Sequence, residues 1–180
     1  MSALSKALSP LAALGVSTLL LAAPQAAYAA DSISCEAAGQ THFLPGVAML
    51  QQSQHVTYQG VVSNCVDFGD LGIRRARISV TFEDVDLSCV ARDFGTGRGT
   101  ATIQWHVNGA KTTSEADITI DETEINTAEV SGFVTEGPFA GRPFTGEFDT
   151  NLLQATGKCT TGALFGGVKS ADFNGHFSIG

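Results

Sequence analysis

The side chains best suited to chemistry in this sequence are four cysteines, four histidines and two short runs of carboxylates. The cysteines are Cys35, Cys65, Cys89 and Cys159. Cysteine thiolates bind zinc, but structural zinc sites use closely spaced C-x-x-C pairs, which this sequence lacks. In proteins that leave the cell, an even number of cysteines is typical of a disulfide framework. We therefore expect two disulfides and no catalytic cysteine.

The histidines give no sign of a catalytic site. They are spread along the chain, and each falls at the polar phase of a predicted strand: His42, His55, His106 and His176. A general base needs its partner within hydrogen-bond reach, and no spacing here brings such groups together. The sequence also lacks the motifs G-x-S-x-G, H-E-x-x-H and G-x-x-x-x-G-K-[ST]. It therefore predicts no catalytic residues and no cofactor, and favours a protein that is not an enzyme.

The carboxylates are the remaining candidates for a metal site. They form two runs, one of Glu83, Asp84 and Asp86 and one of Asp121, Glu122 and Glu124. Calcium takes several oxygen ligands, which turn carboxylates can supply. Neither run has the ligand spacing of a 12-residue calcium loop, so both are interpreted as solvated turns and no metal site is expected.

The first thirty residues have the composition of a secretory signal peptide. Lys6 is their only charged residue, an apolar stretch covers 11–23, and small residues around Ala29 form an A-x-A cleavage signal. The apolar stretch is shorter than the ~18 residues that a membrane span needs. The sequence therefore predicts a signal peptide over 1–30, no membrane span, and one secreted domain over 31–180.

The net negative charge of the chain argues against nucleic acid as a partner. The sequence has 10 basic and 18 acidic residues, and its net charge of −8 becomes −9 when Lys6 is removed with the signal peptide. Basic residues cluster only at Arg74, Arg75 and Arg77. Because the phosphate backbone repels an acidic protein, nucleic acid is not expected as a partner. An unidentified extracellular or cell-wall partner is favoured instead.

Alternating apolar and polar residues dominate the domain and predict strands. From Arg74 to Phe82 the even positions are apolar, whereas Val85 and Leu87 are odd. A bulge near Glu83 and Asp84 would return both sets to one face.

Antiparallel pairing of neighbouring strands predicts the disulfides. If the strands of Cys35 and Cys65 pair antiparallel, positions whose numbers sum to 100 face each other, and these two cysteines form one such pair. A link between Cys89 and Cys159 then follows by elimination.

The segment GTATIQWHVNGAKTTS predicts a two-residue hairpin. Asn108 and Gly109 suit a type I′ turn, because both of its central residues need a positive φ. Trp105 then faces Thr112 on the inward side of the sheet, together with Ile103. We expect Trp105 to fill the core. If the interior is hollow instead, Trp105, Ile103 and Thr112 line its pocket.

Glycines at inward strand positions indicate strong curvature. Gly132, Gly146 and Gly175 each lie among inward-facing residues of a predicted strand. Such positions suit a tightly curled sheet. The sequence therefore predicts an all-β fold, a single compact antiparallel barrel or closed β-sandwich of about eight strands. The only helical candidate is a single turn at 151–155.

Two phenylalanines fall out of phase with the predicted core. Phe133 alternates against its apolar neighbours, and Phe139 lies in the predicted turn EGPFAG. One interpretation is an exposed aromatic patch that would recruit a partner. The favoured interpretation is a loop that folds back over the end of the barrel.

Several motifs in order resemble small secreted four-cysteine proteins of Streptomyces and related actinomycetes. They are a Pro-Gly after the first cysteine strand, LSC at 87–89, IQWHVNGAKTTS, VSGFVTEGPFAG, and NLLQ before the last cysteine. The resemblance covers Cys35 to Ile179, although Cys159 follows NLLQ by several residues where the family has it directly after. It implies export and a compact β domain. The group has no established activity, so it implies no catalytic residues.

Two functions are therefore carried forward. The first is a secreted, non-enzymatic binding or interaction protein that acts outside the cell or at its wall. The second is a small-molecule-binding barrel, either a lipocalin-like carrier or a dirigent-like barrel enzyme, because inward glycines leave space inside the sheet. The first is preferred, because side chains usually fill a barrel of about eight strands.

Overall fold

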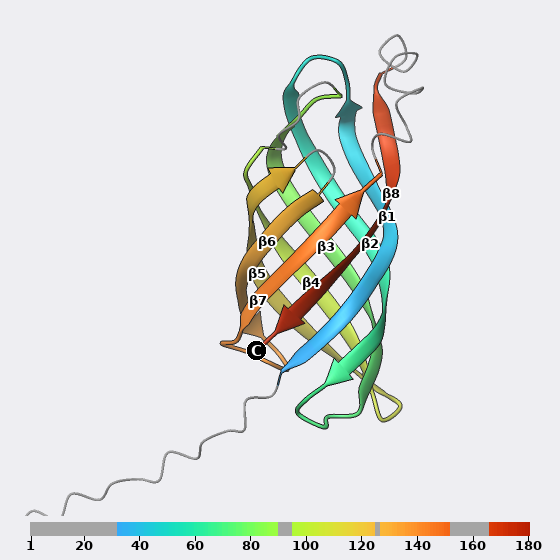
Figure 1. Ribbon diagram of the computed structural model, residues 1–180, viewed down its shortest axis with the longest axis vertical. Coiled ribbons are helices and arrows are strands. Elements are labelled where there is room, and N and C mark those ends of the chain that lie inside the picture. Colours follow the sequence, from blue (N-terminus) through green and yellow to red (C-terminus); the bar gives the residue numbers. More distant parts are fainter. Residues whose placement is uncertain (1–31, 90–94, 125–126, 152–165) are drawn as a thin grey trace, which may run out of the picture.

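The protein is a closed antiparallel β-barrel (Figure 1). The computed structural model describes residues 32–89, 95–124, 127–151 and 166–180. Each strand pairs with the next along the chain, and the last pairs with the first. The strands are β1 (Ile33–Val47), β2 (Gln52–Asp67), β3 (Ile73–Leu87), β4 (Gly97–Val107), β5 (Ala110–Glu124), β6 (Thr127–Glu136), β7 (Pro143–Thr150) and β8 (Val168–Ile179).

The predicted all-β barrel of about eight strands is therefore confirmed, and the sandwich alternative is not observed. The single helical turn suggested at 151–155 falls almost wholly outside the described residues. Over the described ranges, no helix has the length and apolar character needed to cross a membrane.

Side-chain alternation builds the core as predicted. The even positions of β3 from Ala76 to Phe82 face inward, and after the bend Val85 and Leu87 do so too. At the bend, Glu83 and Asp84 of β3 lie against one residue of β2, and Asp84 has a positive φ of 56°. The bulge predicted at this place is confirmed. It keeps both halves of a 15-residue strand on the same core.

The hairpin between β4 and β5 also has the predicted geometry. Asn108 and Gly109 both have a positive φ, 47° and 86°, as a type I′ turn requires. Trp105 pairs with Thr112 across the hairpin. The predicted register therefore holds along the whole pair of strands.

The register between β1 and β2 differs from the prediction by one residue over most of its length. Near the strand ends, Ser34 faces Val66, as predicted, but Ala37 faces Val62. The cause is a bulge at Asn64, which has a positive φ of 49° and adds one residue to β2. A single extra residue turns every following side chain to the other face, so the inward side of β2 is restored.

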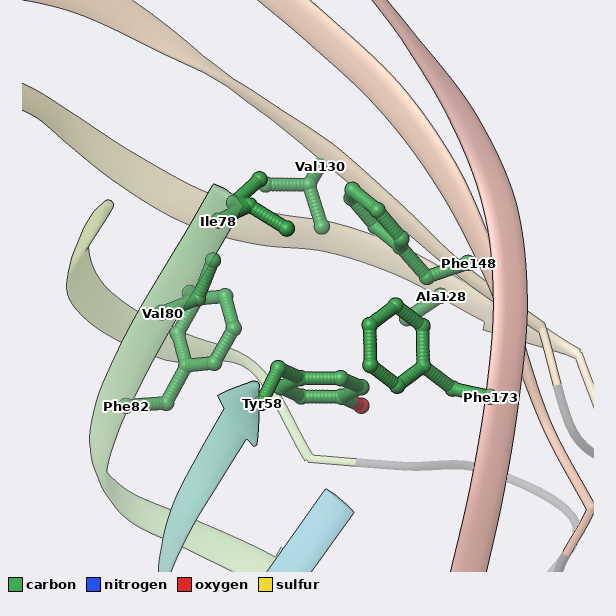
Figure 2. A pocket seen from close by; sticks show the side chains of 8 residues that line it. All are labelled: Tyr58, Ile78, Val80, Phe82, Ala128, Val130, Phe148 and Phe173. Atoms are coloured by element: carbon green, nitrogen blue, oxygen red, sulfur yellow. The ribbon is translucent and has the colours of Figure 1, made fainter. Parts of the chain in front are cut away.

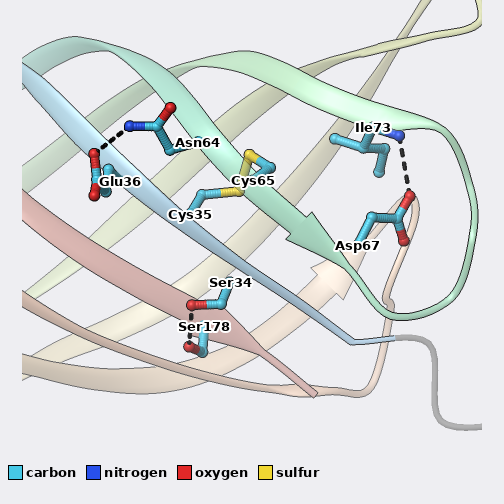
Figure 3. The surroundings of a disulfide bond; sticks show 8 residues. All are labelled: Ser34, Cys35, Glu36, Asn64, Cys65, Asp67, Ile73 and Ser178. Carbon is cyan, nitrogen blue, oxygen red and sulfur yellow. Dashed lines mark hydrogen bonds between the residues drawn. A yellow bond between two sulfur atoms is a disulfide. The ribbon is translucent and has the colours of Figure 1, made fainter.

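The predicted disulfide between Cys35 and Cys65 is confirmed (Figure 3). It lies beside this bulge and joins β1 to β2, with the two Cα atoms 4.1 Å apart. Next to it, the amide of Asn64 donates a hydrogen bond to Glu36, 2.6 Å away. Of the second predicted pair, Cys89 is half-buried against the core, and Cys159 lies outside the described residues. One disulfide is therefore described, where two are predicted.

The inward glycines lie where neighbouring backbones come close. A Cβ atom on Gly132 would be 2.0 Å from the carbonyl oxygen of Asp117, and one on Gly175 would be 2.2 Å from that of Glu147. No side chain fits at such distances. These glycines allow the tight curvature that closes the sheet, as the sequence predicts.

Candidate functional site

One end of the barrel interior is filled around Trp105. The indole is fully buried, and its Nε1 donates a hydrogen bond to Ser114 Oγ at 2.8 Å. Ser114 in turn donates to the carbonyl oxygen of Pro138 at 2.5 Å. Phe139 packs edge-on against the indole at 5.6 Å between ring centroids, and Phe177 lies at 6.3 Å. Trp105 is therefore a core residue whose polar atom is satisfied.

The other residues proposed to line a pocket here line none of the described cavities. Ile103 is fully buried in the same core, and Thr112 is half-buried opposite Trp105. Trp105 therefore fills the core in this region, the expectation preferred over a hollow interior. The hairpin of β4 and β5 helps to close the barrel.

The two phenylalanines of the predicted exposed patch lie in different environments. Phe133 is 62% exposed, as predicted. Phe139 is only 8% exposed, so the patch interpretation is wrong for this residue and the favoured interpretation, a loop folded over the barrel end, applies to it. The turn of 137–142 carries it over the end of the barrel, where it gains the contact with Trp105. Phe133 therefore remains as a surface aromatic without Phe139.

A small cavity lies inside the barrel around Tyr58 (Figure 2). Its lining comes from β2, β3, β6, β7 and β8 and is apolar apart from the phenol, consisting of Tyr58, Ile78, Val80, Phe82, Ala128, Val130, Phe148 and Phe173. The ring of Tyr58 lies edge-on to Phe173 at 5.1 Å and to Phe82 at 6.1 Å. The cavity volume is about 10 Å³, which is room for about one water molecule.

A group of buried hydroxyls surrounds the Tyr58 phenol. Its oxygen lies 3.2 Å from Thr150 Oγ1, and Thr41, which faces Tyr58 across β1 and β2, is also fully buried. Thr41 Oγ1 has no hydrogen-bond partner among the described residues. Burial raises the pKa of the Tyr58 phenol above its ordinary value, an effect that the Thr150 and Thr41 hydroxyls partly offset. The phenol is therefore neutral at physiological pH and suited to hydrogen bonding.

Sequence analysis did not single out Tyr58. Its only local signal is that it alternates with Val56 and Val62 on the inward side of β2. The cavity itself depends on which strands meet across the barrel, so no short segment of sequence indicates it.

The outer wall of the barrel carries a groove that crosses β3 to β7. Two rows of outward side chains line it in cross-strand register, one of Thr81, Thr100, Asp117, Phe133 and Pro143, the other of Glu83, Arg98, Thr119, Ser131 and Thr145. Gly99 and Gly132 lie between them at inward positions. An exposed aromatic ring, hydroxyls, two carboxylates and a guanidinium are thus displayed on one surface. This set of groups can stack on a ligand ring and form hydrogen bonds with it.

Three carboxylates of the acidic runs form local hydrogen bonds. Glu83 lies 2.7 Å from His55 Nδ1, and Asp84 accepts a hydrogen bond from Ser53 at 3.2 Å. In the second run, Asp121 accepts one from Thr119 at 2.8 Å. Over the described ranges, no group of three or more histidine, cysteine or acidic residues is placed to hold a metal ion.

The fold therefore defines an up-and-down antiparallel barrel with a filled core, a small cavity and a grooved outer wall. Comparisons with protein-family models, with curated proteins and with solved structures found no match to this chain.

Proposed function

We propose that this is an exported, non-enzymatic protein that binds an extracellular or cell-wall partner through the outer wall of its barrel. The groove that contains Phe133 is the observation that carries this proposal. An exposed aromatic residue among hydrogen-bonding side chains is typical of a binding surface. By contrast, the interior is packed around Trp105 and leaves only about 10 Å³ beside Tyr58.

Export is supported by the signal-peptide pattern over 1–30 and by the disulfide, because disulfides persist in oxidising compartments. We include a second bridge, Cys89 to Cys159, in the proposal. Mapping of disulfide-linked peptides by mass spectrometry tests it. A fragment that links Cys35 to Cys89 would contradict both the bridge and the strand pairing.

The partner is sought with purified cell walls, polysaccharides and proteins of the culture supernatant. We expect retention of the wild-type protein on one of these materials, and a loss of about tenfold in affinity for Phe133→Ala, because surface aromatics often dominate binding energy. Phe68→Ala is the matched control, since Phe68 is 67% exposed but lies outside the groove. No retention of the wild type, or equal losses for both variants, would contradict the proposal.

A second candidate function is the binding of a small apolar molecule that carries one hydrogen-bonding group. The buried hydroxyls of Tyr58, Thr150 and Thr41 at an apolar cavity favour it, because ligand sites combine apolar walls with few polar groups. A ligand larger than water requires one of the surrounding phenylalanines to move.

Thermal-shift measurements with a library of lipophiles and metabolites test this second function. We expect a ligand to raise the melting temperature, and Tyr58→Phe to weaken its binding about tenfold through loss of one hydrogen bond. Phe133→Ala, on the outer wall, serves as the control and leaves this binding unchanged. A library without any stabilising compound would count against the cavity as a ligand site.

A further inference from the structure

Basic side chains gather at one end of the barrel wall. Arg74, Arg75 and Arg77 of β3 are all exposed, as is Lys111 of β5. His106 of β4 lies between them, since it pairs with Lys111 and occupies the place opposite the irregular step at Arg74 and Arg75. We call these five residues the basic face. Its residues lie near the two hairpins at one end of the barrel (Figure 1), where Gly72 of the β2–β3 connection approaches the side chain of Asn108.

The basic face forms no ion pair with the acidic residues that the structure describes. The neighbours of Arg77 across the sheet are neutral: Val61 and Gln104 flank it, and Thr113 follows Gln104. The nearby carboxylate of Asp67 is engaged by the backbone N–H groups of Gly69 and Ile73, at 3.1 and 3.0 Å.

This concentration of charge is unusual for the chain as a whole, whose net charge is −8. Four of the seven lysines and arginines in the described ranges belong to the basic face. Arginine guanidinium groups bind carboxylates and similar anions in a bidentate manner. An anionic ligand is therefore attracted to this face, while the remainder of the acidic surface repels it.

We propose that the basic face binds an anionic polysaccharide, at a second site that is distinct from the groove of the proposed function. Between the cations, Gln104 and Thr113 offer groups for hydrogen bonds to sugar hydroxyls. The charges of such a chain are spaced more widely than the phosphates of DNA, so that a few of them can pair with a small cluster of cations. Duplex DNA, with one charge per about 1.7 Å, would extend beyond the cluster onto acidic surface.

Binding of polygalacturonate, which carries a carboxylate on each sugar, provides the first test. Calorimetry at low salt is expected to show binding that weakens as salt is raised, since the attraction is electrostatic. Uncharged dextran, double-stranded DNA and vesicles containing phosphatidylglycerol are the comparison arms. Absence of polygalacturonate binding, equal binding to dextran, or tighter binding to DNA or vesicles would overturn the proposal.

Variants locate the site. Arg75→Gln combined with Arg77→Gln is expected to weaken polygalacturonate binding about tenfold or more, because each residue contributes charged hydrogen bonds. The control combines Arg142→Gln with Lys169→Gln, which removes the same charge away from the basic face. Thermal unfolding verifies that both proteins fold. An equal loss in the two proteins would show a general charge effect and overturn the assignment.

The two proposals fail separately. If the wild type is retained on cell walls but the Arg75→Gln, Arg77→Gln variant keeps full polygalacturonate affinity, the basic face is not the site and the proposed function stands. If polygalacturonate binds through the basic face but no cell-wall or extracellular material retains the protein, the proposed function fails. Phe133→Ala is expected to keep polygalacturonate affinity, because Phe133 is not part of the basic face.

Discussion

Replacing Trp105 by alanine is expected to lower the free energy of unfolding by about 3 to 5 kcal/mol, which is the usual cost of truncating a buried tryptophan. Trp105 is fully buried and packs against Phe139 and Phe177, and its indole N–H donates a hydrogen bond to Ser114. The truncation leaves a cavity and removes that hydrogen bond. Domains are stable by about 5 to 15 kcal/mol, so the loss is a large fraction of the total.

Urea denaturation followed by circular dichroism measures this effect. Gln104→Ala is the matched control, because Gln104 precedes Trp105 on β4 but points outward. The control is expected to change stability by less than about 0.5 kcal/mol, as surface substitutions do. A loss below about 1 kcal/mol for Trp105→Ala would mean that this end of the barrel is not packed as described.

Removing the disulfide between Cys35 and Cys65 is expected to destabilise the protein by about 3 to 4 kcal/mol. The bridge closes a loop with a sequence separation of 30 residues. In the chain-entropy model, opening a loop of this length gives the unfolded chain that much additional freedom. The appropriate variant replaces both cysteines by alanine, so that no free thiol is left to form wrong pairs.

The midpoint of urea unfolding of this double variant is compared with that of Ser34→Ala. Ser34 precedes Cys35 in the sequence. Its half-buried hydroxyl accepts a hydrogen bond from Ser178 at 3.2 Å. A small effect is expected for this control. If the double cysteine variant were as stable as the wild type, the bridge would not constrain the unfolded chain as the loop length requires.

Local signals in the sequence were sufficient for much of the barrel. The hairpin at Asn108 and the bulge at Asp84 were both predictable, because turn chemistry and a change of alternation act over a few residues. The register of β1 on β2 was not predicted correctly. Val62 is buried in the core and Cys65 is partly buried against it, although their positions have opposite parity; this change of parity is the sequence signal of the bulge at Asn64.

The candidate sites were less predictable than the fold. Exposure of Phe133 followed from its phase in β6, but burial of Phe139 depends on a turn that folds over the barrel end. The buried hydroxyls of Thr41 and Thr150 meet Tyr58 although they are far apart in sequence. Contacts of this kind depend on which strands become neighbours when the sheet closes, and no local sequence pattern specifies that.

Closure of the barrel also limits how this protein can recognise another polypeptide. Because β8 pairs with β1, each described strand has a hydrogen-bonded neighbour on both sides. Many β proteins bind peptides by adding them as an extra strand at a free sheet edge, and unprotected edges also promote aggregation. The closed ring of strands offers no such edge within the described barrel. Recognition on its wall therefore depends on side chains, and the backbone amides of the sheet remain engaged with one another.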